Sequence, residues 1–338
     1  MNGRPLHCSG YVLYKVSALL HREYGLYNAN MVGSEELEDK NRTARELAAL
    51  SDGGMTFDQL KSQPPYCGFV EVVVFEELRF VMLLVDSDDG VALRWLWNHA
   101  YEPMSLALWS LMARKADVVL DVGAHTGVYS IAAGIAKDKA TVISIEPSWL
   151  NLSRLAANLR ANDLSLECIV PGAISDTEGI TDFTLQTQFV YHSTGGKFGP
   201  TSDARSLQIQ TLRIDSLYRQ HKLAANLVKI DVEGHEANVL RSMPDVLSEC
   251  APDIFIETID PNAANECTAI LKDHGYRFFC IDDGAMSIGS VDTIVPILDN
   301  GHPDMAKLNR LSSKKSPEEI NLLAEQARSL WQAAEHLR

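Results

Sequence analysis

Aspartate, glycine and histidine stand together in residues 118–130, VVLDVGAHTGVYS, and could form one side of a ligand site. The apolar residues up to Val122 are typical of a buried strand, and the glycines that follow predict a turn where backbone can approach a ligand closely. A dinucleotide fingerprint, G-x-G-x-x-G, would need glycines where His125 and Val128 stand, so a pyrophosphate cradle is weakly supported. Asp121 followed by G-x-x-x-G instead suits a ligand with a cationic or neutral amino-acid end.

A second carboxylate, Glu146, follows the apolar run 141–145 and precedes Pro147. It lies 25 positions after Asp121, close to the roughly 20-residue offset at which an acidic side chain binds a ribose diol in nucleotide-binding α/β folds. This spacing favours an adenosine ligand. The alternative is a Glu146 side chain that simply faces solvent at the end of a strand.

A third run, LVKIDVEGHE at 227–236, changes from apolar to charged just before a helical pattern. If the strand continued, Lys229, Asp231 and Glu233 would share one face of it. Burying these charges inside a sheet would be costly, so we expect them at its carboxyl edge, where open α/β sheets bind ligands. The alternative is a salt-bridged edge with a purely structural role.

Short segments rich in Val and Ile alternate with helical patterns from residue 117 onward, which implies a parallel sheet covered by helices on both faces. We predict a Rossmann-like α/β fold in which Asp121, Glu146 and Asp231 meet at one sheet edge. Its seven-stranded, mostly parallel sheet would contain 118–122, 141–145, 168–170, 227–232, 253–258, 278–281 and 293–298.

Two further regions flank this domain, so we expect three parts: 1–115, 116–300 and 301–338. The first carries helical patterns at 11–24 and 35–50 and a hairpin at 69–85 that turns near Glu76-Glu77, without a catalytic motif. The last is a C-terminal helix that begins at Ser316 with a capping pattern. It has an apolar stripe that docks on its own domain or forms a homodimer interface: Ile320, Leu323, Ala327, Leu330, Trp331, Ala334 and Leu337.

Composition limits the partners and the compartment. The 338 residues carry a net charge of −15, which argues against nucleic acid as a partner. No apolar run is long enough to span a bilayer, and the first residues lack the pattern of a secretory signal. Six cysteines without a C-x-x-C pair favour reduced structural thiols, so we expect a cytoplasmic protein.

Taken together, these motifs resemble the FkbM-type S-adenosylmethionine-dependent methyltransferases over about residues 98 to 300. The family commonly shows Asn where this chain has His125. The segments that carry the resemblance are Tyr101-Glu102-Pro103, Asp121 to Gly127, Glu146-Pro147, Asn158, Asn162, Ala173 to Asp176, Leu212 to Leu217, Val228 to Glu236 and Ile256-Glu257.

The resemblance implies a class I methyltransferase fold and S-adenosyl-L-methionine as cofactor. The loop from Asp121 would meet the methionine half, Glu146 the ribose, and Ser175 with Asp176 the adenine. The full expected cofactor set is Asp121, Gly123, Ala124, His125, Gly127, Tyr129, Glu146, Pro147, Ser175 and Asp176.

The implied reaction is methyl transfer to a hydroxyl of a sugar, glycolipid or secondary metabolite. An alcohol needs a base or a metal to remove its proton, and the candidate catalytic residues are Asp231, Glu233, His235 and Glu257. His192 is a weaker candidate. Asp231, Glu233 and Glu257 could hold a divalent metal, which is possible but not expected. The segment 186–205 is equally well explained as an acceptor loop or as an ordinary surface loop.

Two rival functions stay open from sequence. One is an NAD-dependent oxidoreductase, which the missing G-x-G-x-x-G disfavours. The other is a non-catalytic protein that binds an adenosyl ligand, which the charged run at 231–236 mildly disfavours.

Overall fold

The computed structural model describes residues 35–185, 196–198, 206–258, 260–295 and 308–338. The helix expected at 11–24, His192 and most of the segment 186–205 lie outside this part of the chain. Within it, no helix is long and apolar enough to cross a membrane.

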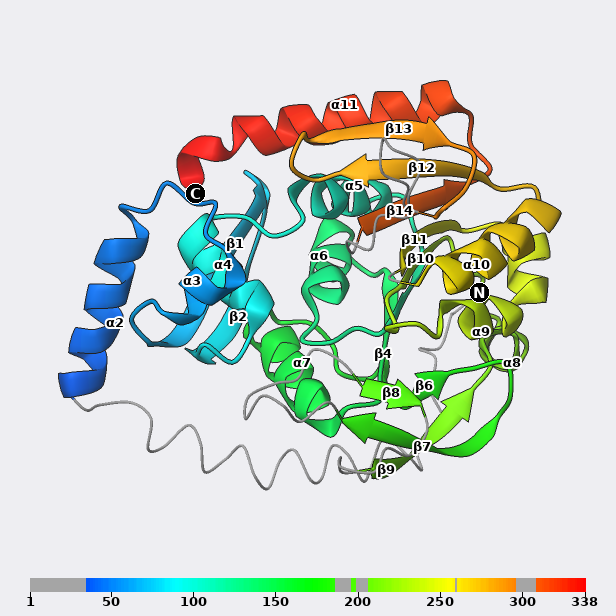
Figure 1. Ribbon diagram of the computed structural model, residues 1–338, viewed down its shortest axis with the longest axis horizontal. Coiled ribbons are helices and arrows are strands. Elements are labelled where there is room, and N and C mark those ends of the chain that lie inside the picture. The colour runs from blue at the N-terminus through cyan, green and yellow to red at the C-terminus, as the bar shows by residue number, and fades with distance from the viewer. Residues whose placement is uncertain (1–34, 186–195, 199–205, 259, 296–307) are drawn as a thin grey trace, which may run out of the picture.

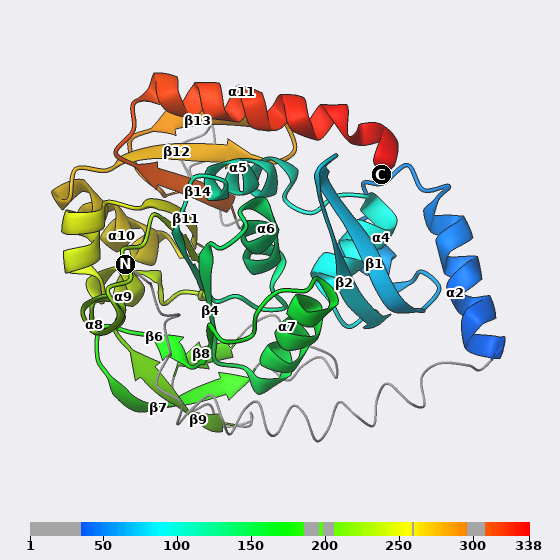
Figure 2. The same cartoon turned by 180° about the vertical axis from the view of Figure 1, so that it is seen from behind.

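The central sheet has eight strands in the order β13-β12-β14-β11-β10-β3-β4-β5 (Figures 1 and 2). Strands β11, β10, β3, β4 and β5 are parallel, and β14 runs antiparallel between β11 and β12. Five of the strands are β3 (Val118–Val122), β4 (Thr141–Glu146), β5 (Ile169–Pro171), β10 (Leu227–Ile230) and β11 (Asp253–Thr258). The other three are β12 (Arg277–Asp282), β13 (Ser287–Val291) and β14 (Leu308–Ser313).

This order confirms the Rossmann-like fold. The chain starts in the middle at β3, moves outward through β4 and β5, and returns to β10 on the other side of β3. Open α/β sheets bind ligands at such a reversal, beyond the carboxyl ends of the strands. Dinucleotide-binding domains have six parallel strands, and this sheet differs from them because it contains the antiparallel β14.

Alternate residues of the strands enter two separate cores, as expected for a sheet covered on both faces. Val119, Leu227 and Phe255 pack toward α5 (Pro103–Ala113), α6 (Val128–Ala136) and α7 (Trp149–Ala161). Leu120, Val228 and Ile254 pack toward the helices of the other face, among them α8 (Ile214–His221), α9 (Glu236–Arg241) and α10 (Pro261–Asp273). A π-helical turn, η1 (Val246–Cys250), lies between α9 and β11.

Three details of the expected sheet were wrong. Residues 293–295 are not in a strand, and 296–298 lie outside the described residues. The strand that pairs with β11 is β14, whose buried residues include the polar Asn309 and Ser312, so no apolar run marks it. Strand β10 also ends at Ile230 rather than Val232.

A four-stranded sheet lies beside the β5 edge, in the order β6-β9-β7-β8. It consists of β6 (Ala173–Ile174), β7 (Gly179–Leu185), β8 (Gly196–Phe198) and β9 (Ser206–Leu212). Strand β6 follows β5 after Gly172, so this small sheet brings Ala173 and Ile174 to the carboxyl edge of the central sheet.

The N-terminal region contains the expected hairpin and one expected helix. Its elements are α2 (Glu35–Ala48), α3 (Phe57–Lys61), β1 (Tyr66–Phe75), β2 (Leu78–Asp86) and α4 (Gly90–Asn98). Helix α5, which links this region to β3, is apolar on all sides and fully surrounded.

Side chains of α7 bind the hairpin to the domain. Asn158 accepts from the Leu83 backbone N–H and donates to the Thr126 carbonyl, each at 2.8 Å. Asn162 exchanges two hydrogen bonds of 2.8 Å with the Val81 backbone. Asn158 and Asn162 thus pair with backbone groups on the edge of β2 that does not face β1. Asn158 also holds the glycine loop after β3 through Thr126.

The C-terminal helix, α11 (Pro317–Ala333), begins at the predicted N-cap, Ser316, whose side chain accepts from the Glu319 backbone N–H. A 3₁₀ turn, η2 (Glu335–Leu337), ends the chain. The apolar stripe of α11 docks on its own chain: its predicted members Ile320, Ala327 and Trp331 are buried, together with Ala324, in the core that includes α5. The described cysteines form no disulfide.

Candidate active site

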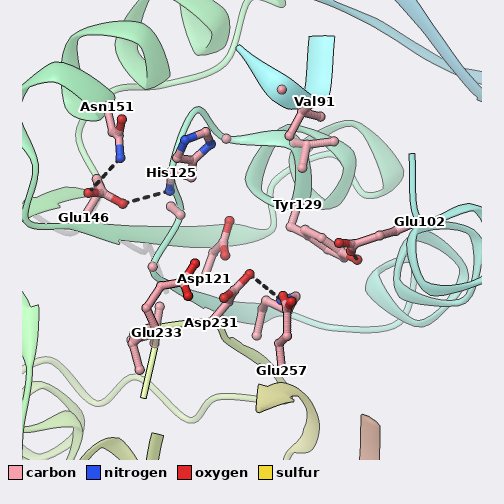
Figure 3. Close-up of a pocket in the computed structure, with 18 of the residues that line it drawn as sticks. Val91, Glu102, Asp121, His125, Tyr129, Glu146, Asn151, Asp231, Glu233 and Glu257 are labelled. Carbon is pink, nitrogen blue, oxygen red and sulfur yellow. Dashed lines mark hydrogen bonds and ion pairs between the residues drawn. The ribbon is translucent and has the colours of Figure 1, made fainter. Parts of the chain in front are cut away.

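A cavity of about 790 Å³ opens at the carboxyl ends of β3, β4, β10 and β11 (Figure 3). Asp121, Glu146 and Asp231 all line it, which confirms that they meet at one sheet edge. The N-terminal region, for which the sequence predicted no catalytic motif, also lines the cavity, through Phe57, Val91, Arg94, Tyr101 and Glu102.

Two glycines let the loop after β3 lie against its neighbours. Gly123 has φ +85°, and a Cβ there would be 1.9 Å from the backbone oxygen of Asp231. Gly127 has φ +100°, and a Cβ would be 2.4 Å from Leu155 Cδ1. The loop and the segment after β10 therefore touch through backbone, which leaves no room for a side chain between the two sides of the cavity.

Glu146 is 5% exposed, so the alternative in which it faces solvent is wrong. Its carboxylate accepts from the backbone N–H groups of His125 at 2.9 Å and Ser148 at 2.8 Å, and from Asn151 Nδ2 at 3.3 Å. Burial raises the pKa of Glu146 to about 7, although these three donors favour the charged form. The side chain is fixed in direction and points into the cavity (Figure 3).

Asp121 lies deeper, at the end of β3. Its Oδ2 accepts from Ser130 Oγ at 2.6 Å, and Ser130 Oγ is 2.7 Å from Ser144 Oγ. Burial raises the pKa of Asp121 to about 6, while the Ser130 hydrogen bond and the charge of Lys229 act in the opposite direction. Asp121 is therefore held by the first turn of α6 and by β4.

A buried ion group occupies the ends of β10 and β11. Lys229 Nζ is 3.3 Å from Asp231 Oδ2 and 3.9 Å from Glu257 Oε2, and it lies 4.9 Å from the centre of the Tyr129 ring. Burial alone would lower the pKa of Lys229, but the nearby carboxylates raise it above its usual value. Burial, and then the charge of Asp231, raise the pKa of Glu257.

A second polar group joins the N-terminal region to the sheet. Glu102 accepts hydrogen bonds from the Tyr129 hydroxyl at 2.5 Å and from Asn309 Nδ2 at 2.7 Å. Glu102, Lys229 and Asn309 line the cavity but were not among the predicted site residues. Lys229 could have been found from its place in the charged run, whereas Asn309 is distant in sequence and carries no motif.

Eleven of the fourteen predicted residues line the cavity; Ser175, Asp176 and His235 do not. These three form a separate cluster behind β6. Ser175 Oγ is 3.0 Å from His235 Nε2 and donates to Asp176 Oδ1 at 3.2 Å. Burial lowers the pKa of His235. The side chain of His235 thus contacts Ser175, directly after β6, and does not line the cavity.

Across the described residues, no group of three or more His, Cys, Asp or Glu side chains has the arrangement of metal ligands. At Asp231 and Glu257, the cation between the carboxylates is the Lys229 ammonium.

Residues 121–278 match the model of the methyltransferase FkbM domain. These residues form an FkbM-type methyltransferase domain. The domain spans β3 to β12, so it contains both the Glu146 side and the Lys229 side of the cavity, while Glu102 and Asn309 come from outside it.

Two curated relatives of this FkbM-type domain carry methyltransferase names. The hexuronic acid methyltransferase AglP of Haloferax volcanii is 29% identical over 136 residues, which are 40% of this chain and 53% of that protein. The 31-O-demethyl-FK506 methyltransferase FkbM of Streptomyces tacrolimicus is 26% identical over 199 residues, 50% of this chain and 76% of that protein. The match thus spans only about half the length of the archaeal relative.

Solved structures give weaker matches. The methyltransferase FkbM of Methylobacillus flagellatus is 14% identical with a TM-score of 0.36, covering 66% of this chain and 55% of that one. A methyltransferase from Agrobacterium tumefaciens is 13% identical with a TM-score of 0.39, covering 73% of this chain and 71% of that one.

S-adenosyl-L-methionine is the cofactor of the FkbM-type domain, and the cavity suits it. Eight Asp or Glu residues line the cavity against two cations, Arg94 and Lys229, so it favours a sulfonium over a diphosphate. Asn151 Oδ1 is buried beside Glu146 and has no hydrogen-bond partner among the described residues, so it can accept a hydrogen bond from a ligand hydroxyl.

Proposed function

We propose that the chain is an S-adenosylmethionine-dependent O-methyltransferase that acts on a hydroxyl of a sugar, glycolipid or secondary metabolite. The observation that supports this proposal is that one cavity holds both the fixed Glu146 carboxylate and the Lys229–Asp231–Glu257 group.

On the cofactor side, Glu146 and Asn151 would accept hydrogen bonds from the ribose hydroxyls. The backbone of Gly123, Ala124, His125 and Gly127 would lie along the methionine half, with Asp121 and Tyr129 behind it. Pro147 would border the ribose. The adenine would lie against Ala173 and Ile174, which line the cavity directly before Ser175 and Asp176. When bound, S-adenosylmethionine supplies an electrophilic methyl group on a sulfonium.

On the acceptor side, Asp231 would receive the proton of the hydroxyl. The hydroxyl oxygen would receive the methyl group that the bound cofactor would supply, while the hydroxyl proton would move to the Asp231 carboxylate. Glu233 also lines the cavity beside Asp231 and would orient the hydroxyl. Holding the acceptor in place would account for much of the rate enhancement, because its oxygen must lie close to the methyl group and in line with it.

The acceptor class rests on two considerations. The named relatives act on a hexuronic acid and on demethylated FK506, both oxygen-rich molecules. The acceptor wall also combines aromatic rings, Phe57 and Tyr101, with carboxylates that accept hydrogen bonds from hydroxyl groups.

The proposal is tested by incubating the purified chain with S-adenosylmethionine and a panel of hydroxyl acceptors that includes uronic acid glycosides and macrolides. Release of S-adenosylhomocysteine together with a methylated product supports it. Binding of NADH in place of S-adenosylmethionine would favour an oxidoreductase. Cofactor binding without transfer to any acceptor of the panel would favour a non-catalytic adenosyl-ligand protein.

A further inference from the structure

Lys229 is the most enclosed charge in the cavity. It lies one residue before the end of β10, between β3 and β11, and is 1% exposed. Its ammonium contacts Asp231, Glu257 and the Tyr129 ring. A buried ammonium is stable only beside negative charge, so this position requires at least one ionised carboxylate.

Asp231 and Glu257 do not have equal access to the cavity. The Glu257 side chain is 6% exposed, and that of Asp231 is 27% exposed. The two carboxyl groups lie 3.3 and 3.9 Å from the same Lys229 Nζ, and adjacent carboxylates disfavour joint ionisation. The more deeply buried Glu257 is therefore the member that retains the proton, while Asp231 carries the charge and faces the cavity.

We propose that Lys229 is a positioning residue: its ammonium selects the state in which Asp231 is ionised and Glu257 is protonated, so that Asp231 can accept the proton of the acceptor hydroxyl. This inference rests on the proposed function. Lys229 itself stays charged throughout and takes no proton from the acceptor.

Other ionisable groups face this trio from the surrounding elements. Asp121 lies beside Lys229 on β3, Glu102 approaches from the start of α5, and Tyr129 comes from α6. Tyr101 lies near Glu257 and Asp231, while Glu233 and Glu236 follow Asp231 in the chain. These neighbours are mostly acidic. Of the two described cations that line the cavity, Arg94 lies over the Tyr101 ring, and Lys229 is the one beside Asp231 and Glu257.

The test is the pH dependence of kcat in variants of the full chain. In Lys229→Met, the acidic limb of the profile should move to higher pH by roughly 1 to 3 units, because Asp231 loses its adjacent cation. In Glu257→Gln, the limb should move by less than about half a unit, because a protonated Glu257 and a glutamine are both neutral. Lys272→Met removes an exposed lysine on α10 and controls for net charge; its limb should stay in place.

If Lys229 had a purely structural role, Lys229→Met would lower kcat at every pH without moving the acidic limb of the profile. That result overturns the proposal. A shift in Glu257→Gln as large as that in Lys229→Met also overturns it. Lys229→Arg keeps the cation and should restore the wild-type limb.

Carboxyl ¹³C NMR of the wild-type protein needs no acceptor and no variant. Asp231 should ionise at lower pH than Glu257, and the reverse order refutes the assignment. If wild type methylates no acceptor, the proposed function fails while this titration still decides the charge state.

Discussion

Gly123→Ala separates the effect of backbone contact from that of backbone conformation. Gly123 has φ +85° and Gly275, a remote glycine after α10, has φ +80°. Alanine at either position should cost about 1–2 kcal/mol for the left-handed conformation. A Cβ at Gly275 meets nothing within 4 Å, so Gly275→Ala is the matched control.

The extra cost at Gly123 follows from the distance to Asp231. A Cβ would lie 1.9 Å from the Asp231 carbonyl oxygen, and real Cβ contacts essentially never fall below 3.0 Å, so the two loops must separate by at least about 1.1 Å. This movement breaks the 3.0 Å hydrogen bond from the Asp231 N–H to the Val122 carbonyl. Loss of a buried hydrogen bond costs about 1–3 kcal/mol, and forced repacking costs about as much again. We expect Gly123→Ala to be about 2–6 kcal/mol less stable than Gly275→Ala.

Urea unfolding followed by tryptophan fluorescence measures this difference, and calorimetry with S-adenosylmethionine measures the effect on the site. Gly123→Ala should weaken cofactor binding, whereas Gly275→Ala should bind as wild type does. Equal stability of the two variants, with unchanged cofactor affinity in Gly123→Ala, would refute the argument that these loops touch through backbone.

Glu146→Gln should weaken S-adenosylmethionine binding by roughly ten- to a hundred-fold in calorimetry, because hydrogen bonds to a charged acceptor are lost. The affinity of the wild-type protein should also fall as the pH drops below about 7, where Glu146 takes up a proton. Without cofactor, the raised pKa of Glu146 contributes to the free energy of unfolding; this contribution is full below pH 4.5 and is lost as the pH rises to about 7. Glu146→Gln should therefore remove about 3 kcal/mol of this pH dependence in urea titrations. An unchanged dependence of the unfolding free energy on pH would contradict this expectation. Asp231→Asn should reduce kcat by roughly two to four powers of ten with little change in cofactor Kd, and full turnover with a verified acceptor would exclude Asp231 as the base. Asn158→Ala should cost about 2–4 kcal/mol in unfolding experiments because it leaves two backbone groups unpaired, whereas Asn262→Ala at an exposed position should cost far less.

The sequence predicted the parts of the fold that depend on local pattern. Strands β3 and β11 begin and end at the predicted residues, since each has a core of consecutive apolar residues, at 118–120 and 254–256. Strand β14 was missed because Asn309, Arg310 and Ser312 are buried polar residues, and Asn309 binds Glu102, which lies far away in the chain. No periodicity rule identifies a strand of this composition.

The same distinction holds for the cavity. Asp121, Glu146 and Asp231 could be placed together because each follows a parallel strand, and parallel strands end at one edge. Glu102, which reaches the site from before α5, depends on how the N-terminal region packs. The charged run was correctly placed at the edge, but β10 ends at Ile230, so Asp231 and Glu233 enter the cavity from a loop and not from one face of a strand.

A crystal structure with S-adenosylhomocysteine tests the central claim most directly. It should show the ribose hydroxyls on Glu146, the methionine half along the backbone of Gly123, and the sulfur facing the Asp231 side of the cavity. An adenosine bound elsewhere, or a ligand in this cavity whose ribose makes no contact with Glu146, would contradict the account.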